Sequence, residues 1–97
     1  MFRSRVERRL LDVAKQLQRA RQELQVLDEQ LVSFADVEDD TRVRALVSDS
    51  PVDTLEHREA GRHADAMRRS RAHLVNRIAD LEKEQDELLD RLPTKSR

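Results

Sequence analysis

The chain has 97 residues, of which 40% are charged and 37% hydrophobic, yet its net charge is only −1. It contains one Gly, two Pro and no Cys, whereas an average protein has ~7% Gly and ~25% charged residues. So few turn-forming residues exclude barrels and Rossmann-like sheets, and the lack of Cys excludes disulfides and thiol catalysis. We expect one all-α unit over residues 1–97, soluble and cytoplasmic, because no apolar run has the length of a membrane span.

Apolar residues in the first third of the chain follow the alternating 4-3 spacing of a coiled coil over four heptads. Charged and amide side chains cover the remaining faces. This pattern predicts a long amphipathic helix over about residues 3–35. Its seam consists of Val6, Leu10, Val13, Leu17, Ala20, Leu24, Leu27, Leu31 and Phe34.

The same spacing returns in the second half and predicts another long helix over about residues 53–92. Pro93 ends it, because the residue before a proline is disfavoured in the α region, and residues 93–97 form a flexible tail. Arg71 and Gln85 fall on the seam, where a polar residue sets the register, although Arg71 could instead extend its charged end into water. The other seam residues are Ala60, Ala64, Met67, Leu74, Ile78, Leu81, Leu88 and Leu92.

The segment between the two long helices is predicted to hold a short helix over about residues 40–48, at the connecting tip. Asp40 can cap its N-terminus, and Val43, Leu46 and Val47 would give it a small apolar face. The fold class is therefore an antiparallel two-helix coiled-coil hairpin with a short helix at its tip.

Charged side chains form blocks of opposite sign, which indicate how the helices pair. Residues 1–21 contain seven basic and two acidic side chains, and residues 22–40 contain seven acidic and no basic ones. The order is reversed in the second helix, since residues 56–73 are net basic and residues 80–92 net acidic. An antiparallel hairpin pairs opposite charges at both ends, whereas a parallel dimer of either helix stacks like charges.

The register of this hairpin has two candidate solutions. If facing residue numbers sum to about 98, Val6 faces Leu92 and Leu17 faces Leu81 across a coiled-coil seam. A slip by one heptad pairs Leu17 with Leu74 instead. We favour the first solution because it brings the helix ends flush.

Several apolar residues lie outside the seam and would be exposed to water in a bare hairpin. Two helices bury little surface, so these residues predict association with a protein partner, most simply a second copy in a four-helix bundle. The candidate interaction residues are Leu11, Val26, Val32, Val75 and Leu89.

Catalytic, cofactor-binding and metal-binding sites are not expected. His57, His63 and His73 are spaced by six and ten residues, not by the three or four that bring metal ligands onto one helix face. Gly61 stands alone, so no phosphate-binding glycine loop exists, and it more simply allows close helix packing. Basic residues within 3–21 could contact nucleic acid, but pairing with the acidic block 80–92 explains them better.

An acidic segment, Asp36-Val37-Glu38-Asp39-Asp40, is expected at the apex of the hairpin. It could be a solvated turn in which one Asp caps the short helix. A hairpin with tip carboxylates also resembles the coiled coil of bacterial transcript-cleavage factors. That resemblance implies a tip that enters RNA polymerase and helps to hold a catalytic magnesium ion, through Asp36, Glu38, Asp39 and Asp40.

The start Phe2-Arg3-Ser4-Arg5-Val6-Glu7-Arg8-Arg9-Leu10-Leu11 is similar to that of short, Arg-rich helical-hairpin proteins of unknown function from actinobacteria. The primary hypothesis is a non-enzymatic, homodimeric protein-interaction module. The alternative is a regulator that binds RNA polymerase or the ribosome through the acidic tip or the basic N-terminal stretch.

Overall fold

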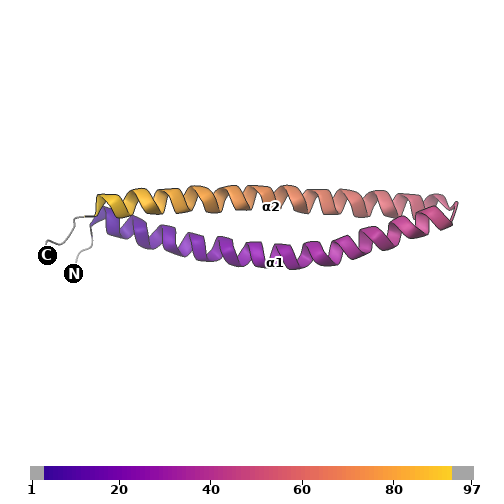
Figure 1. Ribbon diagram of the computed structural model, residues 1–97, viewed down its shortest axis with the longest axis horizontal. Helices are drawn as coiled ribbons and strands as arrows, with labels where there is room; N and C mark the ends of the chain where they lie inside the picture. The colour runs from indigo at the N-terminus through magenta and orange to yellow at the C-terminus, as the bar shows by residue number, and fades with distance from the viewer. Residues whose placement is uncertain (1–3, 93–97) are drawn as a thin grey trace.

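A computed structural model describes residues 4–92 and shows an antiparallel helical hairpin (Figure 1). Helix α1 spans Arg5–Val47, helix α2 spans Pro51–Arg91, and three residues connect them. No strand occurs within the described range, so the predicted all-α hairpin is confirmed. The start of α1 lies beside the end of α2 (Figure 1). The expected helix start at residue 3 and the expected tail at residues 93–97 lie outside the described residues.

Serine side chains cap the N-termini of both helices. The Ser4 hydroxyl accepts a hydrogen bond from the Glu7 N–H at 3.1 Å, and the Glu7 carboxylate accepts one from the Ser4 N–H at 3.2 Å, which completes a capping box. Ser50 caps α2 by accepting from the Val52 N–H at 3.3 Å, with Pro51 in the first turn. These caps satisfy N–H groups that a helix start leaves without intrahelical partners.

The predicted short helix at residues 40–48 is wrong, because α1 continues through this segment to Val47 without a break. Residues 36–47 contain no Gly or Pro, and local contacts along one helix support the extra turns. Asp40 accepts a hydrogen bond from Arg44 at 2.6 Å, and the Thr41 hydroxyl donates to the Glu38 carbonyl at 3.0 Å. The apolar pattern stops after Phe34, but the helix does not stop with it.

Contacts between the helices show the register whose facing residue numbers sum to about 98. Thr41 lies opposite His57, with Oγ1 and Nδ1 3.5 Å apart, and the rings of Phe34 and His63 are 5.1 Å apart. The turn is therefore centred on Asp49, which leaves no room for a slip by one heptad.

Ion pairs join the charge blocks as the antiparallel arrangement predicts. Near the open end of the hairpin, Arg9 donates to Glu84 at 2.5 and 2.8 Å, and Arg21 donates to Glu82 at 2.9 Å. The basic N-terminal stretch thus contacts the acidic end of α2. Towards the turn the signs are reversed, and Arg68 of α2 donates to Glu38 of α1 at 3.2 Å.

The cluster of large buried side chains that forms the dry core lies at the open end of the hairpin, which we call the base. Val13, Leu17, Leu81 and Leu88 are buried there, and Val6, Leu10 and Ile78 pack against them. Ala20 and Ala64 are also buried. The remaining predicted seam residues are half-buried, namely Leu24, Leu27, Leu31, Phe34, Ala60, Met67, Arg71, Leu74, Gln85 and Leu92. Neither helix, as far as residues 4–92 show, contains a stretch apolar and long enough to cross a membrane.

Candidate interaction surface

The middle of the hairpin is more open than its base. Helix α1 bows away from α2 there and returns to it near the turn (Figure 1). The largest half-buried seam residues, including Leu27, Phe34 and Met67, lie in this stretch. Near the turn the α2 seam narrows to Ala60 and Ala64, so the helices can approach each other again. Large seam side chains between two closely packed ends leave the middle of the core only partly covered.

Three depressions follow one another along one side of this open stretch. The largest has a volume of about 700 Å³ and includes Val26, Leu27 and Leu74. The second, of about 340 Å³, shares Leu27 with the first, and the third, of about 360 Å³, shares Phe34 with the second. Together they form one continuous trough, which we call the groove. Its apolar floor consists of Leu27, Phe34, Met67 and Leu74.

The groove walls carry charge only towards the two ends. In the central part they consist of Val26, Gln30, Ala66 and Ser70, flanked by His73 on one side and His63 on the other. Charged side chains begin at the base end with Arg19, Glu23 and Arg77, and at the turn end with Arg44, Glu56 and Glu59. The centre of the groove therefore offers apolar and small polar groups without a formal charge.

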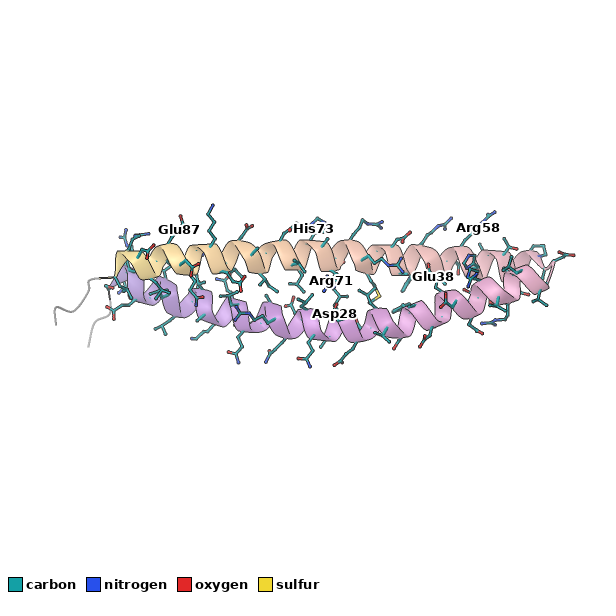
Figure 2. All side chains as sticks on the ribbon, viewed as in Figure 1. Asp28, Glu38, Arg58, Arg71, His73 and Glu87 are labelled. Carbon is teal, nitrogen blue, oxygen red and sulfur yellow. The ribbon has the colours of Figure 1, made fainter. Side chains whose placement is uncertain are left out.

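The opposite side of the hairpin, which we call the ion-pair flank, is bridged by charges at the same level. Arg71 of α2 extends towards Asp28 of α1 (Figure 2), and its Nε donates to the carboxylate at 2.5 Å. This hydrogen bond raises the pKa of Arg71. The guanidinium of Arg71 thus lies outside the seam, half-exposed and paired with Asp28. This placement agrees with both roles expected for a seam arginine, which are to set the register and to extend its charged end towards water.

The five predicted interaction residues divide between these two sides. Val26 lines the groove. Val32 lies in a depression of α1 beside Asp28 on the ion-pair flank. Glu82 lies on that flank as the partner of Arg21, and Val75 and Leu89 lie seven residues before and after it. Leu11 lies twenty-one residues, or three heptads, before Val32. Because seven residues make nearly two helical turns, all but Val26 lie along the ion-pair flank.

The acidic segment does not lie at the tip, so that prediction is wrong. It occupies the side of α1, well before the turn, because the register places Asp49 at the apex. Glu38 pairs with Arg68, and Asp40 pairs with Arg44. Asp39 lies 4.0 Å from Arg42, and Asp36 makes no ion pair within residues 4–92. These carboxylates mostly hold neighbouring arginines of the same chain.

The real tip combines a polar seam with apolar outer faces. Thr41, only 5% exposed, occupies the seam next to His57. The outer faces carry exposed apolar side chains that we call the tip patch: Val43, Leu46, Val47, Val52 and Leu55. Sequence reasoning missed this patch because it assigned three of these residues to the face of a short helix. The sequence did indicate a continuous helix here. If the heptad phase is continued beyond Phe34, it places Glu38, Thr41 and Ala45 on the seam.

The histidines lie apart along α2. His57 lies beside Thr41, His63 stacks at a tilt of 37° against Phe34, and His73 lines the groove. Across the described part of the chain, no three His, Cys, Asp or Glu side chains are arranged to hold a metal ion. Comparison with family models, with curated proteins and with solved structures gave no match.

Proposed function

We propose that this protein is a non-enzymatic coiled-coil module that binds protein chains, in the first place a second copy of itself. One observation carries the proposal: among the described residues, more large apolar side chains are exposed than are fully buried. Six apolar residues are buried, three of them alanine or valine, whereas eleven large apolar side chains are exposed. A helical unit of this size gains stability by covering such a surface with another chain.

The groove supports binding of a chain better than binding of a small substrate. It is an open trough along the side of two helices, whereas catalytic sites use enclosed, desolvated pockets to shift the pKa values of reacting groups. The shifted pKa values in residues 4–92 belong to ion pairs on the outside of the hairpin. For example, the Arg9 guanidinium lowers the pKa of the Glu84 carboxyl. These shifts accompany structural pairs.

The alternative function, regulation of RNA polymerase or the ribosome, draws no support from carboxylates at the tip. The carboxylates at residues 36–40 lie on the side of α1. Within the basic stretch, Arg9 and Arg21 pair with Glu84 and Glu82 of the same chain.

Sedimentation equilibrium of the purified protein tests the proposed self-association. The monomer mass is 11.4 kDa, and we expect the apparent mass to rise towards twice this value at tens of micromolar. Because apolar burial drives the association, raising the salt concentration should not abolish it. A mass that stays monomeric over this range, at both low and high salt, would contradict the proposal.

A further inference from the structure

We infer that the groove binds the groove of a second copy of this chain, with the two hairpins antiparallel and related by a two-fold axis near Gln30 and Ser70. This inference rests on the proposed self-association and assigns its surface and orientation. Such a dimer would bury the apolar floor of both grooves in the core of a four-helix bundle.

The distribution of charge favours the groove over the ion-pair flank. Covering the middle of the ion-pair flank would take the pairs Arg71–Asp28 and Arg68–Glu38 out of water, and the loss of hydration can exceed the attraction within each pair. The middle of the groove carries no Asp, Glu, Lys or Arg side chain and has small Ala66 and Ser70 side chains on one wall. A second helix can therefore approach there without burying an ion.

The charges at the groove ends decide the orientation. In the observed register Arg77 lies level with Arg21, about nine residues to the base side of Gln30. Glu59 lies level with Asp39, about nine residues to the turn side. Both side chains are therefore ~14 Å from the level of Gln30, in opposite directions. A two-fold axis at Gln30 therefore brings Arg77 of one copy to Glu59 of the other. A parallel dimer would instead place Arg77 against Arg77 and Glu59 against Glu59.

A second charge pair follows the same geometry. Arg19 lies about eleven residues to the base side of Gln30, and Glu56 lies about twelve residues to the turn side, so the same axis brings these two side chains to one level. Glu23, the remaining acid at the base end, falls at the level of Val37 and His63 of the second copy. Arg44, which lies 3.8 Å from Glu56 of its own copy, falls about three residues beyond the level of Arg19.

Two valines of α1 provide a matched pair of variants that test the surface. Val26 is 53% exposed in the groove and Val32 is 67% exposed on the ion-pair flank, so neither is needed for the dry core. We expect Val26→Glu to raise the dimer dissociation constant at least about tenfold and Val32→Glu to change it less than about threefold, because an interface charge is costly only where it is buried. Circular dichroism should show equal helix content in both variants.

Exchange of the groove charges tests the orientation. Arg77 donates a hydrogen bond only to the neutral Gln16, and Glu59 forms no ion pair within residues 4–92, so Arg77→Glu and Glu59→Arg leave the ion pairs of the hairpin intact. We expect each variant alone to dimerise more weakly than the wild type. An equimolar mixture of the two should form heterodimers with wild-type affinity, because both cross-copy pairs are then opposite in sign.

Each outcome of these experiments separates the two claims. If the wild type is monomeric, the proposed function fails together with the inference. If the wild type dimerises but Val32→Glu disrupts the dimer and Val26→Glu does not, self-association stands and the groove is not its surface. If Arg77→Glu and Glu59→Arg each dimerise as tightly as the wild type, Arg77 and Glu59 do not pair across the two copies, and the antiparallel assignment is overturned.

Discussion

The base and the tip of the hairpin share one heptad register but fill it with opposite kinds of side chain. At the base, Leu17 and Leu81 face each other in a dry core. At the tip, the seam contains Thr41 and His57, and the apolar side chains point outward. The comparison shows that the seam pattern sets where the helices touch, whereas the chemistry of the seam residues sets where stability is concentrated.

The ends of α1 and α2 at the tip therefore depend for their stability on local interactions and on the packing of the base. Asp40–Arg44 is an ion pair within one helical turn, and the turn is closed by a hydrogen bond from the Ser50 N–H to the Ser48 hydroxyl at 3.1 Å. Such exposed contacts contribute little individually. We expect the tip to open more readily than the base, and the following predictions test this difference from the largest effect to the smallest.

Truncation of a base core residue should be far more damaging than truncation at the tip. Leu17 is 1% exposed, so Leu17→Ala should lower the free energy of unfolding by about 2–4 kcal/mol through lost burial and a cavity. Leu46 is 75% exposed, so Leu46→Ala should change it by less than about 0.5 kcal/mol. Urea unfolding, followed by circular dichroism at one protein concentration, measures both. Equal losses would remove the distinction between base and tip.

Amide hydrogen exchange should follow the same division. Amides of residues 13–20 and 78–88 should be protected at least about tenfold more than those of residues 41–46 and 54–57, because opening at the tip exposes little apolar surface. Exchange measured by NMR at a fixed concentration resolves the two groups. Uniform protection along both helices would show that the polar seam is as stable as the core.

Gly61 offers a way to strengthen the half of the hairpin nearer the turn without touching the base. A Cβ at this position would lie 3.6 Å from the nearest atom, the end of the Glu38 side chain, which is an ordinary contact. Gly61→Ala should therefore raise the free energy of unfolding by about 0.5–1 kcal/mol, because Ala is favoured in a helix interior. A destabilised variant in urea unfolding would show that the helices approach more closely than this distance indicates.

The smallest effect concerns the ion pair at the base. The Arg9 guanidinium lowers the pKa of the Glu84 carboxyl, so the folded state binds a proton there less readily than the unfolded chain. The pair contributes fully to the free energy of unfolding at pH values above the ordinary glutamate pKa. This contribution is lost as the pH falls through the lowered pKa. Glu84→Gln should therefore flatten the decline of the urea midpoint at acidic pH.

Glu87→Gln is the matched control for this measurement. Glu87 points away from α1 (Figure 2) and forms no ion pair within the described residues. Its replacement should leave the acidic decline as steep as in the wild type. An identical change in both variants would mean that the Arg9 pair has no specific effect on the pH dependence.

Much of this fold could be predicted because the seam pattern is long and regular. The spacing from Val6 to Phe34, its counterpart from Ala60 to Leu92 and the reciprocal charge blocks were enough for the hairpin, its direction and its preferred register. Because facing residue numbers sum to about 98 in this register, the turn must be centred on Asp49. An acidic tip at residues 36–40 is therefore inconsistent with that register on the seam spacing alone.

Other features depended on information that the apolar pattern does not carry. The helix through residues 36–47 is held by polar and small seam residues, so a search for apolar spacing misses it. Val26 and Val32 are equivalent as exposed valines of one helix, and the contacts across to α2 separate them. The open middle arises from the bow of α1 between two closely packed ends (Figure 1).

The orientation of two labelled copies tests the central claim most directly. The chain has no Cys, so Lys15→Cys introduces a unique site for a spin label at an exposed position of α1. An antiparallel dimer centred at Gln30 separates the two labels by about 45 Å along the helix axes, as the helical rise requires. Pulsed dipolar spectroscopy should detect this distance, and a distance below about 30 Å, or no coupling between labelled chains, would contradict the account.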